Sequence, residues 1–188
     1  MIIIDITPAA TAFGLIAIAE LGDKTQLSVL ALSAMYDRKK VFAGAVAAFA
    51  LVTGLGVLVG KALFMLADPE VIRMLAGLLF LVFGVWILLS RPNSDRNDKA
   101  IGNPLFSTFS MIALAEMGDK TQLTAITLSA RFDSPYFVFL GAFLALAAIS
   151  LMGVLAGKKL NESVPISKIR FGAGALFILS GIAFLAGI

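Results

Sequence analysis

The sequence contains 188 residues, of which 60% are hydrophobic and only 14% carry a charge. A soluble domain of this composition would have too little polar surface to cover itself, so we expect an integral membrane protein. The chain has no cysteine and no histidine, which excludes disulfide bonds, thiolate ligands and imidazole ligands. Its 15 lysines and arginines barely exceed its 12 aspartates and glutamates and lie mostly in short loops, so no nucleic-acid partner is expected.

Apolar runs of about 20 residues follow one another along the chain, separated by short segments rich in charged residues, proline and asparagine. Asp5 is the only charge before Glu20, so the first run lacks the basic start of a secretory signal and is expected to remain as a spanning helix. We predict an all-α integral membrane protein with six transmembrane helices, at residues 8–34, 41–66, 70–90, 102–131, 136–157 and 167–187.

The two halves of the chain are copies of one another. Residues 20–37 align with residues 116–133 at an offset of 96, and residues 56–84 align with residues 153–181 at an offset of 97. The expected organisation is a first three-helix repeat at 1–90, a cytoplasmic linker at 91–103 and a second three-helix repeat at 104–188. Because three spans are an odd number, the second repeat must enter the membrane from the opposite side. This inverted repeat is typical of secondary transporters that place their site at the midplane.

The basic residues are divided unevenly between the two sides of this arrangement. The richer side holds Arg38, Lys39, Lys40, Arg91, Arg96, Lys99, Lys158, Lys159, Lys168 and Arg170. The other side holds Lys61, Arg73 and Arg131. By the positive-inside rule the richer side is cytoplasmic, so both termini are expected on the non-cytoplasmic side.

One nine-residue motif occurs twice inside the predicted spans. The first copy, residues 19–27, reads Ala-Glu-Leu-Gly-Asp-Lys-Thr-Gln-Leu, and the second, residues 115–123, differs only by a methionine in place of the first leucine. A charge at the centre of a bilayer costs about 2.5–3.5 kcal/mol on insertion scales, so such residues usually face a cavity and have a function. We therefore expect the functional site at this duplicated motif.

The predicted metal ligands are the four carboxylates of the two motifs, Glu20, Asp23, Glu116 and Asp119. Residues three apart share one face of a helix, so the two carboxylates of each copy should point the same way. Antiparallel packing of the first and fourth spans can then bring all four to one point. Oxygen donors in this number favour Ca²⁺, Mn²⁺ or Mg²⁺ over a soft metal.

The motif lysines supply the counter-charge. Lys24 and Lys120 stand four residues after the glutamates of their own copies, the favourable order for an ion pair on a helix. In the purely structural interpretation these charges only neutralise one another. Two lysines against four carboxylates leave two negative charges, however, enough for one divalent cation or two protons.

Neutral polar residues complete the motif as secondary ligands or neighbours of the ligands: Gln26, Gln122, Thr25 and Thr121. The glutamines fit neutral ligands and interhelical hydrogen bonds equally well. The threonines should point to the far side of a continuous helix, so hydrogen bonding to their own helix is favoured over ligation. Gly22 and Gly118 can loosen the helix and free backbone carbonyls.

The two copies, Glu-Leu-Gly-Asp-Lys-Thr at 20–25 and Glu-Met-Gly-Asp-Lys-Thr at 116–121, resemble the duplicated motif of the calcium/manganese cation–proton antiporters. That family includes the Golgi calcium/manganese transporters and bacterial manganese exporters, and the resemblance covers the whole chain. It implies export of Mn²⁺, or exchange of Ca²⁺ or Mn²⁺ for protons, with the four motif carboxylates in the ion site. The short chain looks like a bacterial member, which implies a multi-pass protein of the bacterial inner membrane.

We therefore expect a carrier rather than an enzyme. It would need no cofactor, bind Mn²⁺ or Ca²⁺ as transported substrate and use protons as the coupling ion. Three alternatives stay open: an exporter of small organic cations or amino acids, a passive cation channel, and an intramembrane aspartyl protease using Asp23 and Asp119. The preference for Mn²⁺ over Ca²⁺ and the oligomeric state are also open.

Overall fold

The computed structural model describes residues 5–59, 69–89 and 103–187, and every regular element in these ranges is an α-helix. The helices are α1 (Thr7–Glu20), α2 (Lys24–Met35), α3 (Arg38–Val59), α5 (Pro69–Leu89), α6 (Pro104–Glu116), α7 (Lys120–Phe132), α8 (Pro135–Ser163) and α9 (Ile166–Ala186). The predicted all-helical fold is confirmed for this part of the chain. The end of the second predicted span and all but the last residue of the predicted linker at 91–103 lie outside the described residues.

Within the described residues, three helices are long and apolar enough to cross a membrane: Arg38–Leu58, Pro135–Ser163 and Ile166–Ala186. Shorter apolar helices lie at Thr7–Glu20, Arg73–Leu89 and Pro104–Glu116. The described part of the chain is therefore all-helical and contains helices that can span a membrane. α8 continues past the end of the fifth predicted span, and Lys158 and Glu162 form an ion pair of 3.9 Å in its last turns.

The first and fourth predicted spans are each divided into two helices at the repeated motif. α1 and α2 replace the first, and α6 and α7 replace the fourth, so the prediction of continuous helices at 8–34 and 102–131 was wrong. The cause is the backbone at Gly22 and Gly118, where φ is 83° and 82°. This left-handed conformation cannot continue a right-handed helix, and glycine is the residue that adopts it without steric cost.

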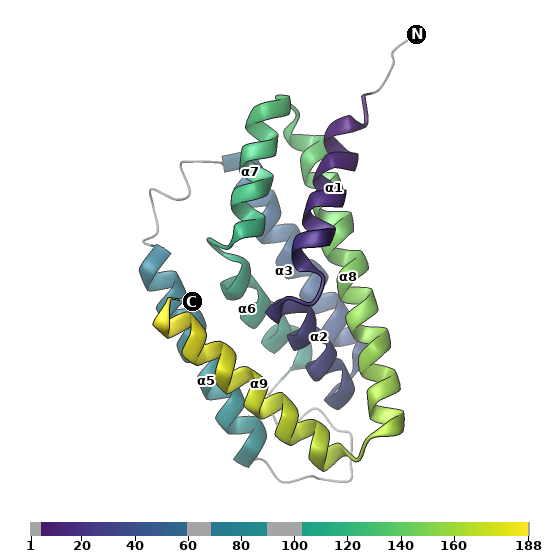
Figure 1. The fold of residues 1–188 in the computed structure, drawn as a ribbon, viewed down its shortest axis with the longest axis vertical. Helices are drawn as coiled ribbons and strands as arrows, with labels where there is room; N and C mark the ends of the chain where they lie inside the picture. The colour runs from purple at the N-terminus through teal and green to yellow at the C-terminus, as the bar shows by residue number, and fades with distance from the viewer. Residues whose placement is uncertain (1–4, 60–68, 90–102, 188) are drawn as a thin grey trace.

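The packing of the two halves is matched. The contact of α1 with α8 corresponds to the contact of α6 with α3. In the same way, the contact of α2 with α8 corresponds to the contact of α7 with α3. The long helices α3 and α8 pack against each other. In Figure 1 the chain runs down through α1 and α2 and up through α6 and α7, so the two broken pairs run in opposite directions. The two motifs are thereby placed in neighbouring elements near the middle of the bundle.

Two glycines related by the repeat allow close contacts between helices. A Cβ atom on Gly44 of α3 would collide with the backbone of Leu105 in α6, and one on Gly141 of α8 would collide with the backbone of Ala9 in α1. Close approach of the backbones is typical of membrane helices that pack through small residues. These contacts position α1 and α6, which end at the two motif glutamates.

α5 and α9 form a separate crossing pair beside the other helices (Figure 1). A Cβ atom on Gly77 would lie 3.0 Å from the carbonyl oxygen of Gly181, and one on Gly84 would lie 2.9 Å from that of Gly174. The pair is attached to the rest of the bundle where α9 packs against α2 and α5 packs against α6. α9 is thereby brought next to the first motif.

Candidate functional site

Each motif forms a short non-helical link between two half-helices. α1 ends at Glu20, and the backbone N–H of Asp23 donates to the carbonyl oxygen of Glu20 at 3.1 Å. The equivalent bond in the second copy joins Asp119 to Glu116 at 3.2 Å. Both aspartates occupy the N-cap position of the following helix. The glutamates therefore lie at helix C-termini and the aspartates at helix N-termini, so the prediction that they share one helix face was wrong.

The glutamine side chains close these links. The Oε1 atom of Gln26 accepts a hydrogen bond from the Gly22 N–H at 2.6 Å, and that of Gln122 accepts from the Gly118 N–H at 2.7 Å. The Nε2 atom of Gln122 also donates to the carbonyl oxygen of Val52 in α3 at 3.2 Å. Interhelical hydrogen bonding, one of the two roles considered for the glutamines, is thus found for Gln122. Both amide oxygens stabilise the break in their own motif.

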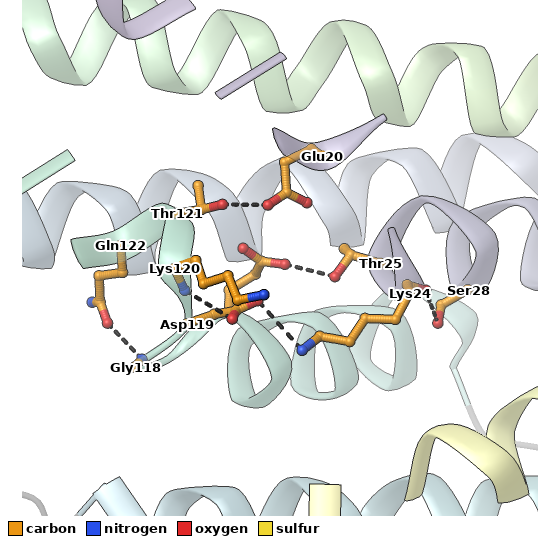
Figure 2. A network of polar contacts seen from close by, with 10 residues as sticks. Glu20, Lys24, Thr25, Ser28, Gly118, Asp119, Lys120, Thr121 and Gln122 are labelled. Carbon is orange, nitrogen blue, oxygen red and sulfur yellow. Dashed lines mark hydrogen bonds and ion pairs between the residues drawn. The ribbon is translucent and has the colours of Figure 1, made fainter. Parts of the chain in front are cut away.

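The threonines connect the two motifs to each other. The Thr25 hydroxyl donates to Oε1 of Glu116 at 2.6 Å, and the Thr121 hydroxyl donates to Oε1 of Glu20. All four side chains are buried. The expectation that the threonines bond to their own helix was wrong, because the break turns each half-helix away from the direction a continuous helix would have. Figure 2 marks the bonds of Thr121 and Thr25 by dashed lines.

The lysine of the first motif also reaches across to the second. Lys24 Nζ lies 3.4 Å from Oδ2 of Asp119 and 4.4 Å from the centre of the Phe184 ring. A dashed line marks the ion pair between Lys24 and Asp119 in Figure 2. Asp119 Oδ1 accepts a hydrogen bond from the backbone N–H of Lys120 at 2.8 Å. In the described part of the chain, neither motif lysine forms an ion pair with the glutamate of its own copy. The break removes the helical spacing on which that prediction depended.

Phe184 is a contact of the site that the sequence analysis did not single out. Phenylalanine is abundant in this chain, with 15 residues, and most such rings pack in the core or face lipid. The available signal was a mismatch between the repeats, because position 87, which corresponds to Phe184 at the offset of 97, is isoleucine.

The motif carboxylates interact electrostatically with one another but do not surround one common point. Glu116 interacts electrostatically with Glu20, Asp23 and Asp119. Among the described residues, however, no three acidic side chains come close enough together to hold one metal ion between them. The expected convergence of four carboxylates on one point is therefore not found in this conformation.

The environment of the glutamates nevertheless suits a cation. Glu20 and Glu116 are 3% exposed, and each ends a half-helix whose C-terminal carbonyl groups carry the negative end of the helix dipole. The donors are carboxylate, hydroxyl and backbone carbonyl oxygens, which are the ligands that Mn²⁺, Ca²⁺ and Mg²⁺ prefer. The glutamate carboxylates can therefore give up a proton, or the hydrogen bond from a threonine hydroxyl, and bind a hard cation in its place.

Comparison with known proteins identifies a family for the chain. The family described as "Divalent cation/proton antiporter GDT1" matches residues 8–95 and 104–187. The chain is 30% identical to a protein of Vibrio cholerae named "Putative manganese exporter", over 89% of this chain and 85% of that protein. It is 25% identical to GDT1-like protein C186.05c of Schizosaccharomyces pombe, over 88% and 84% of the two chains. It is 29% identical to the chloroplastic protein PAM71 of Arabidopsis thaliana, over 90% of this chain and 54% of that protein.

No solved structure matches the chain. The family match covers both halves, including the two motifs, and the similarity to the Vibrio protein extends over most of both chains. The chain belongs to the GDT1 family of divalent cation/proton antiporters.

Proposed function

We propose that the protein exports a divalent cation from the bacterial cytoplasm, with Mn²⁺ as its main substrate, in exchange for protons. The observation that supports this most directly is the pair of buried glutamates, each bonded to a threonine of the opposite motif. The name of the Vibrio relative favours Mn²⁺ as the cation. Ca²⁺ takes similar oxygen ligands and is the second substrate to test.

The proposed ion site is formed by Glu20, Asp23, Glu116 and Asp119. A carboxylate that binds a cation when ionised loses that ability when protonated, so protons and cations compete for the same oxygen atoms. Export then follows if the site opens to the cytoplasm to take up the cation and to the outside to take up protons. The threonine hydroxyls keep the glutamates hydrogen-bonded while neither side has access.

The proposed architecture is six membrane crossings, arranged as two inverted three-helix repeats at 1–90 and 104–188. α1 has 14 residues and α2 has 12. At 1.5 Å per residue these helices are about 21 and 18 Å long, so neither spans a hydrocarbon core of about 30 Å alone, but the two together do. α6 and α7 have 13 residues each and form the equivalent broken span. Broken helices of this kind bring backbone charge to a midplane site in other transporters.

The proposed orientation follows the distribution of basic residues. Arg38, Lys39 and Lys40 lie at the start of α3, and Lys158 and Lys159 lie near the end of α8. These ends would face the cytoplasm of the bacterial inner membrane, with both termini on the other side.

Transport by the purified protein in liposomes tests this proposal. Mn²⁺ and Ca²⁺ fluxes are followed with and without an imposed pH gradient, and Glu116→Gln is the control. Proton-driven movement of Mn²⁺ against its gradient, absent in Glu116→Gln, is the expected result. Flux that only runs down the cation gradient would indicate a channel, and no cation flux would refute the proposal.

A further inference from the structure

The two motif aspartates differ in what holds them. Asp119 has both carboxylate oxygens engaged, one with the Lys24 ammonium at 3.4 Å and one with the Lys120 backbone at 2.8 Å. Asp23 makes no capping hydrogen bond, and its carboxylate has no hydrogen-bond or ion-pair partner among the described residues. Lys120, the counterpart of Lys24, is exposed and pairs with no carboxylate in the same part of the chain. The repeat is therefore asymmetric at its charged residues.

One sequence difference between the halves accompanies this asymmetry, at Phe184. Its ring lies 4.4 Å from Lys24 Nζ, within the range of a cation–π contact. The corresponding residue of the first half, Ile87, is buried and has no aromatic ring to offer Lys120. Seven residues earlier, by contrast, both halves carry a phenylalanine, and these two residues, Phe80 and Phe177, contact each other. Lys24 therefore has an aromatic partner for which the first half offers no ring at the corresponding position.

The packing of the helices also differs between the two halves. α9 packs against α2, the half-helix that begins at Lys24. The corresponding pair in the repeat, α5 and α7, makes no comparable contact among the described residues. Phe184 also packs against Phe80 of α5, with ring centres 5.4 Å apart, which fixes the ring over the lysine. The contact between Phe184 and Lys24 thus belongs to the conformation in which α9 lies on α2.

We propose that Phe184 is a positioning residue that holds the Lys24 ammonium on Asp119 and so leaves Asp23 as the aspartate that receives the incoming divalent cation. The inference rests on the proposed cation transport and assigns different roles to the two copies of the motif. Lys24 directly follows Asp23 in the chain, so an ammonium that is not held by Phe184 can instead pair with Asp23. Phe184 prevents this competition, and Asp119 joins the site when the ion pair opens.

Two single variants of equal net charge test the inequality of the aspartates. Asp119→Asn removes the carboxylate that pairs with Lys24, whereas Asp23→Asn removes the free carboxylate. Mn²⁺ binding to the purified full chain is measured at equilibrium, from the loss of the electron paramagnetic resonance signal of free Mn²⁺. We expect Asp23→Asn to bind Mn²⁺ about tenfold more weakly than Asp119→Asn, because the aspartate that it keeps is paired with Lys24. Adding Lys24→Met to both variants should remove this difference, because it frees Asp119. Equal affinities of the two single variants would overturn the inference.

A second experiment tests Phe184 itself. Phe184→Ile, which introduces the residue found at the corresponding position of the first half, should weaken Mn²⁺ binding about two- to fivefold, the size of an exposed cation–π contact. Phe184→Tyr keeps the ring and should restore the affinity. Phe171→Ile, an exposed phenylalanine on the same helix, controls for loss of a ring in general. Phe184→Leu provides a second aliphatic variant if the isoleucine disturbs folding.

A double-mutant cycle separates positioning from packing. If Phe184 acts through Lys24, Phe184→Ile should have no further effect on Mn²⁺ affinity in a Lys24→Met background. An equal loss in both backgrounds would show that Phe184 only supports packing and would overturn its positioning role. Failure of the unmodified protein to bind or transport Mn²⁺ would refute the proposed function, and this inference with it. Normal binding together with an equal loss in both backgrounds would refute the inference alone.

Discussion

Replacing Thr25 by valine removes the hydroxyl that donates to the buried Glu116 at 2.6 Å, and it preserves the shape of the side chain. Glu116 is 3% exposed, so water has little access to replace the lost donor. Loss of a hydrogen bond to a buried polar group costs about 1–3 kcal/mol. For a chain of this size each kcal/mol shifts Tm by about 2–4 °C, so we expect Tm to fall by about 2–12 °C. Thr121→Val should act in the same way through Glu20.

The assay is thermal unfolding of the purified protein in detergent, with Thr127→Val as the matched control. Thr127 is exposed, and its hydroxyl donates to the Leu123 carbonyl oxygen of its own helix at 2.8 Å, so its loss should change Tm little. Thr25→Ser, which keeps a hydroxyl, should recover most of the stability. If Thr25→Val and Thr127→Val lowered Tm equally, the buried hydroxyl–carboxylate bond would not contribute to stability as argued.

Three further predictions follow from the same geometry. Glu116→Gln should abolish proton-driven Mn²⁺ flux in liposomes, whereas Glu162→Gln, which changes an exposed glutamate at the end of α8, should retain it. Gly118→Ala should lower the free energy of unfolding by about 1–2 kcal/mol because φ is 82° there. The control Gly172→Ala, in a helix with open space around it, should be neutral or stabilising. Equal changes of the two variants in chemical denaturation would contradict the argument. Mn²⁺ at about 100 times its Kd should stabilise the protein by about 2.7 kcal/mol in thermal unfolding. Acidification should reduce this gain, because protons occupy the carboxylates, and a gain that is independent of pH would contradict proton competition.

The helical class and the location of the candidate site were predictable because they depend on local sequence. Long apolar runs indicate spanning helices, and charged residues inside two of these runs indicate a functional motif. The breaks at Gly22 and Gly118 were only partly predictable. Glycine inside a helix is compatible with both a loosened helix and a complete break, and the distinction depends on the glutamine side chains that bond to the glycine N–H groups.

The partners of the motif residues were not predictable from the sequence. Thr25 bonds to Glu116, which is 91 residues away, and Lys24 pairs with Asp119 rather than with Glu20. Helical spacing describes contacts within one continuous helix, and it fails once the helix is broken. Similarly, the repeat indicates that two copies meet, but the relative position of the copies depends on packing between helices such as α3 with α6 and α1 with α8.

The reciprocal bonds give a physical reason for duplicating the motif. Each glutamate takes its hydroxyl donor from the opposite half, so a movement that separates the two breaks removes both hydrogen bonds at once. Buried carboxylates left without donors are costly in a low-dielectric interior. A bound cation or bound protons can replace the hydroxyl donors and remove that cost. In the proposed carrier, opening of the site is therefore favourable only when a ligand is present, which is the condition for exchange without leakage.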